Sequence, residues 1–224
     1  MRLIDTHSHL FLEEFSEDFP QVIERARAAG VTHIFMPNID STTIEAMLSA
    51  CSVYKGYCFP MIGLHPTSVN ANYEKELEIV ARELKFSKEY VAIGEIGMDL
   101  YWDKTYLKEQ QIVLDKQVNW ALEYDLPIVI HCRDAFDYIY KVLEPYKKTP
   151  LRGIFHSFTG TAEEATRVLE FSDFFIGING VVTFKKSHLP EILAGIPLEK
   201  IVLETDSPYL TPVPNRGKRN ESAY

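Results

Sequence analysis

The chain of 224 residues has the size of one TIM barrel, and its 46% content of hydrophobic residues excludes a disordered chain. Its formal net charge of −9 excludes broad, non-specific binding to duplex nucleic acid but allows a local basic surface at an active site. The three cysteines form no C-x-x-C motif, and the sequence contains neither a signal peptide nor an apolar run of roughly 18 residues. We therefore expect a cytoplasmic protein without a membrane partner, and a monomer.

Short apolar runs alternate with longer helical patterns, and no linker, repeat or low-complexity tract interrupts them, so a single domain over residues 1–224 is expected. The apolar runs predict strands at residues 3–5, 31–37, 58–64, 91–96, 128–131, 153–156, 174–178 and 201–204. The segments between them predict helices at residues 17–29, 42–53, 74–86, 104–124, 135–146, 162–170 and 187–195. In the clearest helix, 104–124, the predicted buried stripe consists of Leu107, Gln111, Leu114, Val118, Ala121 and Leu122.

This alternation predicts a parallel sheet. The eight predicted strands favour a closed TIM-type (β/α)₈ barrel over an open doubly wound sheet. An open sheet would carry a glycine-rich phosphate loop after the first strand, whereas residues 5–9 read Asp-Thr-His-Ser-His. After the eighth strand the chain runs through three prolines to Tyr224 without a helical pattern. We therefore expect the last outer helix to be missing, as in a barrel shortened at its C-terminus.

Catalytic residues of TIM barrels lie at the carboxyl ends of the strands. Side chains of metal-ligand type stand at or just after most of these ends in the sequence. They are His7, His9, His65, Glu95, His131, His156 and Asp206. The remaining histidines, His33 and His188, fall within a predicted strand and a predicted helix.

Each of these residues also has an ordinary structural interpretation. His7 and His9 could be loop histidines, although their spacing of two places both rings on one face of an extended chain. Glu95 follows an apolar run, where a buried anion needs a cation, either a metal or a neighbouring Arg or Lys. His131 and His156 could be hydrogen-bonded core histidines.

Taken singly, Asp206 could be a helix N-cap, but six such residues from five strands favour a metal site. Imidazoles mixed with carboxylates suit Zn²⁺, Mn²⁺, Ni²⁺ or Mg²⁺. Six ligands exceed the need of one catalytic ion, so two divalent ions about 3.5–4 Å apart, bridged by Glu95, are predicted.

The motifs around these residues resemble those of the TatD family of metal-dependent deoxyribonucleases. They are Asp-Thr-His-Ser-His at 5–9, Gly-Leu-His-Pro at 63–66, Gly-Glu-Ile-Gly-Met-Asp at 94–99, His-Cys-Arg-Asp-Ala at 131–135, Phe-His-Ser-Phe-Thr-Gly at 155–160 and Glu-Thr-Asp-Ser-Pro-Tyr-Leu at 204–210. Many relatives have Asp-Tyr-Tyr-Arg-Asp where residues 99–103 read Asp-Leu-Tyr-Trp-Asp, so a phosphate contact could be replaced here by a surface for base stacking.

The resemblance implies an amidohydrolase-type barrel that hydrolyses ester bonds, with 3′–5′ exonuclease action on single-stranded DNA and often RNA, supported by Mg²⁺ or another divalent ion. It also implies a C-terminal helix beyond Tyr224. Two sets of metal ligands follow from it, one consisting of His7, His9, Glu95 and Asp206, the other of Glu95, His131 and His156.

For the reaction, we expect Asp206 to act as the general base for the attacking water, with Glu95 as the catalytic carboxylate that bridges the ions. Residues expected to contact substrate share the same end of the barrel. They are His65, Trp102, Arg133, Lys185 and Arg216, with Lys218 and Arg219 equally compatible with a solvated loop.

Two alternatives remain open. The first is a metallohydrolase of the same superfamily that acts on a small ester, amide or phosphoester; such enzymes commonly use a carboxylated lysine at strand four, where this chain has Glu95. The second is a protein that binds metal and nucleic-acid ends without catalysis.

Overall fold

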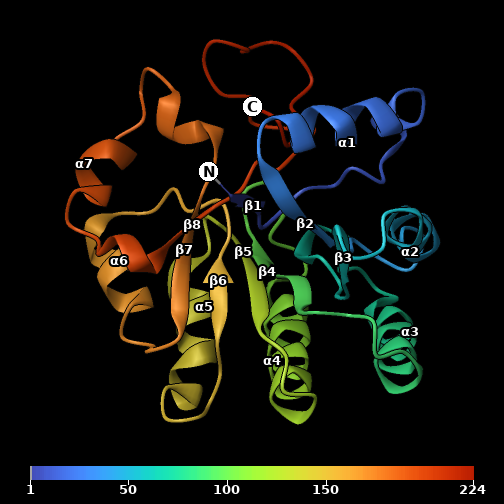
Figure 1. Ribbon diagram of the computed structural model, residues 1–224. Coiled ribbons are helices and arrows are strands. Elements are labelled where there is room, and N and C mark those ends of the chain that lie inside the picture. The colour runs from blue at the N-terminus through green and yellow to red at the C-terminus, as the bar shows by residue number, and fades with distance from the viewer. Residues whose placement is uncertain (1) are drawn as a thin grey trace.

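The structure is a computed structural model that describes residues 2–224, and it contains alternating strands and helices (Figure 1). The strands are β1 (Leu3–Asp5), β2 (Val31–Pro37), β3 (Cys58–Met61), β4 (Ile93–Asp99), β5 (Ile128–Arg133), β6 (Gly153–Phe155), β7 (Phe174–Ile178) and β8 (Ile201–Leu203). The helices are α1 (Phe19–Ala28), α2 (Ile44–Val53), α3 (Tyr73–Phe86), α4 (Leu107–Glu123), α5 (Phe136–Leu143), α6 (Ala162–Val168) and α7 (Leu189–Leu193).

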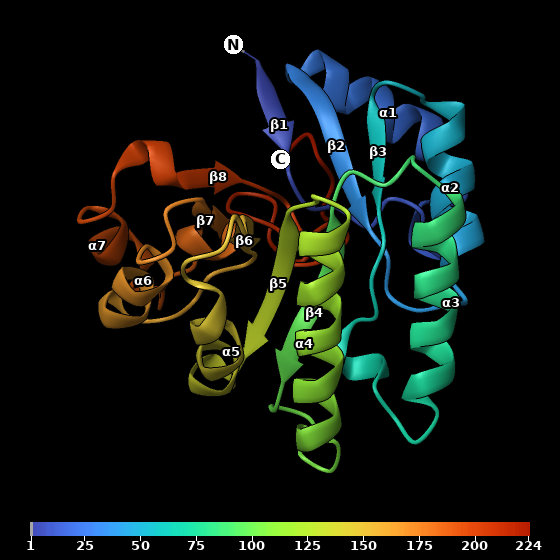
Figure 2. The same cartoon turned by 90° about the horizontal axis from the view of Figure 1, so that it is seen from below.

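All neighbouring strands are parallel, and they form a closed ring. Hydrogen bonds order the strands as β1-β2-β3 and as β4-β5-β6-β7-β8. A parallel bridge between Ile62 and Ile93 joins β3 to β4, and one between Ser8 and Ser207 joins β1 to β8. The helices lie outside the strands, as Figure 2 shows for α1 to α6. The predicted TIM-type (β/α)₈ barrel is therefore confirmed.

Strands β2 to β7 are nearly continuous in apolar residues because both of their faces are covered. In β1 and β8, by contrast, Ile4 is 45% exposed and Leu203 is 55% exposed. All seven residues of β4 are buried, and its apolar side chains Ile93, Ile96 and Met98 belong to the main apolar core. Strand β4 begins at Ile93 and extends to Asp99, whereas residues 91–96 were predicted. The longer strand pairs with β5 as far as Asp99 and Arg133, and this brings both residues to the barrel mouth.

The buried side of helix α4 carries two side-chain amides that hydrogen-bond to the strand ends at this mouth, so it is not entirely apolar. Gln110 and Gln117 are buried, so the predicted stripe through Gln111 was wrong at this point. The Gln117 side chain accepts a hydrogen bond from the backbone N–H of Leu64 at 2.7 Å, and that of Gln110 accepts one from Asp99 at 2.9 Å. A side-chain amide can satisfy backbone groups that lack a strand partner, so both strand ends are held in place.

Residues 204–224 contain no helix, as expected, and they pack against the start of the chain. The Asn220 side chain donates hydrogen bonds to the carbonyls of Thr205 and Tyr209 at 2.8 and 2.6 Å. The hydroxyl of Ser222 donates one to the carboxylate of Asp5 at 2.6 Å. This final segment thus fixes the turn after β8 to the end of β1.

Among the described residues, no helix combines the length and the apolar character that a membrane span requires.

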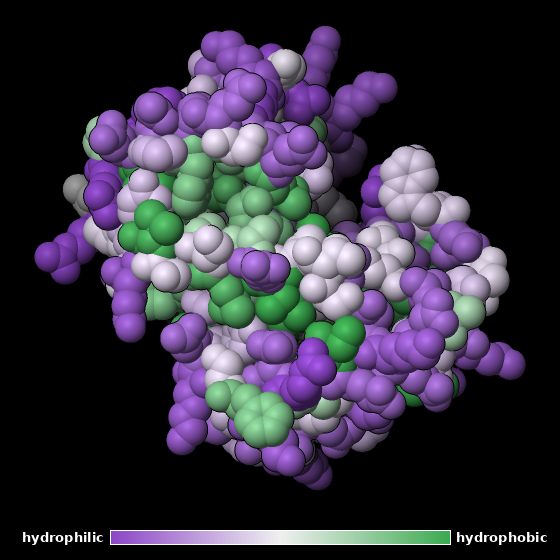
Figure 3. All heavy atoms as spheres, turned by 90° about the vertical axis from the view of Figure 1, so that its right-hand side faces the viewer, coloured by the Kyte–Doolittle hydropathy of each residue, from purple (hydrophilic) through white to green (hydrophobic). Residues whose placement is uncertain are grey.

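Figure 3 shows the side of the molecule that carries α2 and α3, where apolar side chains gather near the middle and polar ones surround them.

Candidate metal centre

The carboxyl ends of six strands bring seven ligand-type side chains together. All six predicted metal ligands meet there, and His65, predicted as a substrate contact, joins them. We call this set the Glu95 cluster; it consists of His7, His9, His65, Glu95, His131, His156 and Asp206. The structure thus brings all seven side chains together at one end of the barrel.

Glu95 is the hub of the cluster. Its Oε1 lies 2.9 Å from Nδ1 of His131, 3.3 Å from Nε2 of His65 and 3.5 Å from Nε2 of His156. Its Oε2 lies 3.1 Å from Nε2 of His7. Only 3% of the Glu95 side chain is exposed, so a carboxylate is enclosed by imidazoles instead of by Arg or Lys.

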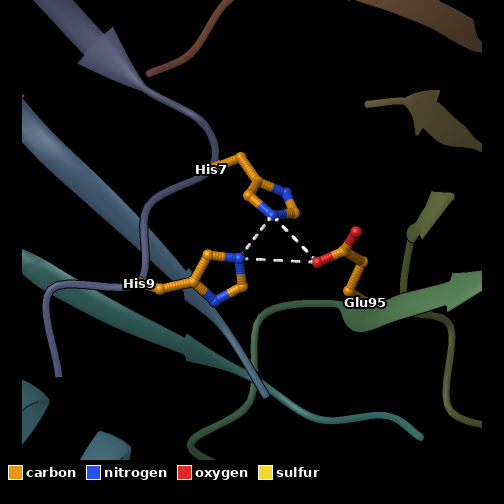
Figure 4. Close-up of side chains that lie close together, drawn as sticks. All are labelled: His7, His9 and Glu95. Atoms are coloured by element: carbon orange, nitrogen blue, oxygen red, sulfur yellow. Dashed lines mark hydrogen bonds and ion pairs between the residues drawn. The ribbon is translucent and has the colours of Figure 1, made fainter. Parts of the chain in front are cut away.

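His7 and His9 face Glu95 from the loop after β1 (Figure 4). Their Nε2 atoms are 3.2 Å apart, and both rings direct this atom towards the same carboxylate oxygen. Asp206 completes this side of the cluster, with Oδ1 3.6 Å from Nε2 of His9 and 3.8 Å from that of His7.

Backbone pairing between distant segments places these three residues. The N–H of Asp206 donates to the carbonyl of His7 at 2.9 Å, and that of His9 donates to the carbonyl of Ser207 at 2.8 Å. Asp5 is buried beside them and accepts hydrogen bonds from the N–H and hydroxyl of Thr205 at 2.9 and 2.7 Å. Asp206 itself has a φ of +57°, a left-handed conformation that is uncommon for residues other than glycine.

Two further buried carboxylates contact the cluster from outside, and sequence reasoning missed both. Asp99 Oδ2 lies 2.9 Å from Nε2 of His131, and Glu204 Oε1 lies 3.0 Å from Nδ1 of His156. Both could have been predicted from their spacing, because side chains an even number of residues apart in an extended chain project to the same side. Asp99 is four residues after Glu95, and Glu204 is two residues before Asp206. Outer carboxylates of this kind orient metal-binding histidines.

The charges in the cluster shift several pKa values. Burial alone would raise the pKa of Glu95, but the charges of His65, His7 and His156 outweigh it and hold this pKa well below its usual range. Burial lowers the pKa values of His7 and His65.

The pKa values of the other two histidines move in the opposite direction. Burial would lower the pKa of His131, but hydrogen bonds to Asp99 and Glu95 raise it to about 9. The charges of Glu204 and Glu95 likewise overcome burial and raise the pKa of His156 to about 10.

Three overlapping groups in the cluster have ligand atoms close enough to share an ion. They are His7, His9 and Glu95; His7, His156 and Asp206; and His65, Glu95 and His131. Imidazole nitrogens combined with carboxylate oxygens form a donor set that suits divalent ions such as Zn²⁺, Mn²⁺ and Ni²⁺. Glu95 belongs to two of these groups and His7 to two.

Two of the residues expected to contact substrate lie together at the mouth. Trp102 follows β4 and is 73% exposed, and the Arg133 guanidinium lies at the end of β5 with its Cζ 5.2 Å from the indole centroid.

The other expected contacts differ in how freely their charges face solvent. Arg219 forms an ion pair with Asp18 at 2.8 Å, which occupies its charge. Arg216 lies over the Phe184 ring, 3.7 Å from its centroid, and Lys185 and Lys218 are exposed.

The barrel and the Glu95 cluster define a metal-dependent hydrolase, and comparisons with known proteins identify its family. Residues 4–224 match the family described as TatD related DNase. The chain therefore belongs to the TatD family.

Its relatives cover nearly the whole chain. It is 39% identical to the metal-dependent hydrolase YabD of Bacillus subtilis, over 99% of this chain and 86% of that protein. It is 32% identical to the 3′-5′ ssDNA/RNA exonuclease TatD of Pantoea ananatis, over 99% of this chain and 87% of that protein. The crystal structure of YjjV, a TatD homologue from Escherichia coli K12, matches with a TM-score of 0.91 at 30% identity, covering 99% of this chain and 85% of that one.

Proposed function

We propose that this hydrolase cleaves phosphodiester bonds of nucleic acid and releases nucleotides from the 3′ ends of single strands, with two divalent metal ions held by the Glu95 cluster. One observation carries the proposal: five imidazoles and the carboxylate of Asp206 surround the buried carboxylate of Glu95, and together these seven side chains come from six strand ends. The name of the Pantoea ananatis relative supports the choice of a single-stranded DNA or RNA substrate.

The donor set fits two ions. His7, His9 and Asp206 would hold one and His131 and His156 the other, with Glu95 shared between them. Mg²⁺, Mn²⁺, Zn²⁺ and Ni²⁺ are all compatible with such ligands. When bound, divalent ions polarise a phosphoryl oxygen and make water more acidic.

Asp206 is the carboxylate best placed to accept the proton of the attacking water. Its side chain is 14% exposed, compared with 3% for Glu95, so a water molecule can reach it. Burial would raise its pKa, but the hydrogen bond with His9 and the charges of His156 and His7 lower it, which keeps the carboxylate ionised at neutral pH. An ionised carboxylate open to solvent can act as a general base.

Positive charge near the mouth would hold the substrate phosphates. Lys185 and Arg216 are our candidates for phosphate contacts, and His65 is our candidate for a contact beside the cleaved bond. Hydrolysis of a small ester or amide is less well supported, because β4 has no lysine that could be carboxylated to bridge two ions.

Substituting Asp206 tests the proposal. We expect Asp206→Asn to keep its circular dichroism spectrum and to lose about 100-fold or more of its activity, because the amide cannot accept the proton. The assay follows 5′-labelled single-stranded DNA with Mg²⁺, Mn²⁺ or Zn²⁺, and cleavage from the 3′ end gives a ladder of shortened strands. Asp173→Asn, which changes an exposed carboxylate, is the matched control.

A near-wild-type rate for Asp206→Asn would reject the assigned base. The remaining alternatives are separated by assaying the wild-type protein beside a variant in which both His7 and His9 are substituted. If the wild-type protein cleaves only small esters or amides, the nuclease proposal fails. If it binds DNA tightly and never cleaves it under any of the three ions, the protein is a binder.

A further inference from the structure

A compact group of exposed side chains lies at the mouth beside the Glu95 cluster. The Arg133 Cζ is 3.7 Å from the ring centroid of Tyr101, and the rings of Tyr101 and Trp102 meet edge to face with centroids 4.8 Å apart. Tyr101 is 53% exposed and Trp102 is 73% exposed. We call these three residues the aromatic shelf.

The shelf is fixed to the Glu95 cluster through a single carboxylate. Oδ1 of Asp99 accepts a hydrogen bond from the backbone N–H of Tyr101 at 3.1 Å, while its Oδ2 lies 2.9 Å from Nε2 of His131. Asp99 and Arg133 are also partners in the β4–β5 register. Only the side chain of Asp99 therefore separates the shelf from His131, which contacts Glu95.

Its composition matches a nucleotide better than it matches a protein partner. Base faces stack on exposed aromatic rings, and a guanidinium attracts a phosphate. Within residues 2–224, Arg133 forms no ion pair, so its charge is available. In a chain with a net charge of −9, a phosphate approaching the mouth needs such a local cation.

We propose that the aromatic shelf binds a nucleotide of the single strand next to the bond that is cleaved: Trp102 stacks on its base, and Arg133 contacts its phosphate. The inference rests on the proposed function, because the strand must lead into the Glu95 cluster. It deepens that function by explaining a preference for single strands, since the base faces of a duplex are covered by their neighbours and cannot stack on Trp102.

The chain has two tryptophans, which permits a direct test without metal. Trp120 lies within α4, so Trp120→Phe leaves Trp102 as the only indole. In the presence of EDTA, we expect single-stranded oligothymidylate to quench the fluorescence of this variant. Unchanged fluorescence, or equal quenching by an abasic strand with the same phosphates, would overturn the proposal.

Substitutions in the otherwise unchanged protein extend the test. Trp102→Ala should raise the Kd for the same oligothymidylate by about 5- to 150-fold, whereas Trp102→Phe should retain most of the affinity because a ring remains. Phe86→Ala removes a side chain that is 76% exposed at the end of α3, at the opposite end of the barrel, and should leave the Kd unchanged. Equal Kd values for Trp102→Ala and Phe86→Ala would reject stacking.

The phosphate contact has its own readout. Arg133→Gln should reduce the slope of log Kd against log salt concentration by about 0.7, the value for one phosphate contact with a single strand. An unchanged slope would remove Arg133 from the proposed site.

The two proposals fail in distinguishable ways. If Trp102 is quenched by single strands but no metal supports cleavage, the shelf holds and the nuclease proposal fails. If DNA is cleaved while the Kd and KM are insensitive to Trp102→Ala, the nuclease proposal holds and the shelf fails.

Discussion

At the scale of single residues, two histidines of the Glu95 cluster are held by carboxylates behind them. Glu204 faces the Nδ1 of His156 and also accepts a hydrogen bond from the N–H of Ser157 at 2.5 Å. It fits closely, since a Cβ on Gly177 would lie 2.5 Å from its Oε2. Glu204 thereby directs Nε2 of His156 towards Glu95.

We expect Glu204→Gln to weaken metal binding by about 10- to 100-fold, because a neutral amide orients and polarises His156 less strongly than a carboxylate does. Titration calorimetry with Mn²⁺ measures the effect. Glu45→Gln, at an exposed position in α2, serves as the control and should bind like the wild-type protein. Equal affinities for the two variants would mean that Glu204 has no such role.

The positions of the proposed ligands could be predicted from sequence because each stands at the end of an apolar run, and parallel strands of a barrel end on the same side. The partners of these residues could not. Asp99 and Glu204 act on histidines 32 and 48 residues away in the chain, 131 − 99 and 204 − 156, and such pairing depends on strand register. Local periodicity contains no information about register between strands.

At the scale of elements, Gly97 in strand β4 allows β4 and β5 to approach each other closely. Gly97 has a φ of +137°, and a Cβ at this position would lie 2.0 Å from the carbonyl oxygen of His131. Any side chain here would push β5 away and move His131 out of the cluster.

Gly97→Ala should therefore lower the free energy of unfolding by more than about 2 kcal/mol, as measured by urea denaturation of the metal-free protein. Gly56→Ala is the matched control, because Gly56 also has a positive φ of +80° but its Cβ would have no atom within 4 Å. This control should lose only about 1–2 kcal/mol, the cost of a left-handed residue. The clash with His131 is refuted if both variants lose the same amount.

Most elements could be predicted because buried parallel strands are short and continuously apolar, while the helices between them are longer and periodic. The end of β4 was harder to predict because its last residues include Gly97 and Asp99, which are unfavourable in strands. Pairing with β5 outweighs these local preferences. Gln110 and Gln117 were missed for a similar reason, since their partners are backbone groups of other loops.

At the scale of the whole molecule, protonation of two histidines in the Glu95 cluster links its charge to pH when no metal is bound. The pKa values of His131 and His156 are raised to about 9 and about 10, by Asp99 and Glu95 for the first and by Glu204 and Glu95 for the second. A histidine with a raised pKa stabilises the folded state fully below its unfolded pKa of about 6.5. That contribution is lost as the pH rises through the folded value.

A metal ion must displace these protons in order to bind, so we expect about two protons to be released at pH 7 and the affinity to rise with pH up to about 10. Calorimetric titration in buffers of different ionisation enthalpy counts the released protons. Binding without proton release, or an affinity that falls between pH 7 and 9, would contradict the charge distribution described above.

Anomalous diffraction from crystals soaked with Mn²⁺ tests most directly the proposal that Glu95 lies between two metal ions. We expect two peaks about 3.5–4 Å apart, one beside His7, His9 and Asp206 and the other beside His131 and His156. A single anomalous peak within bonding distance of Glu95, or none, would contradict this arrangement.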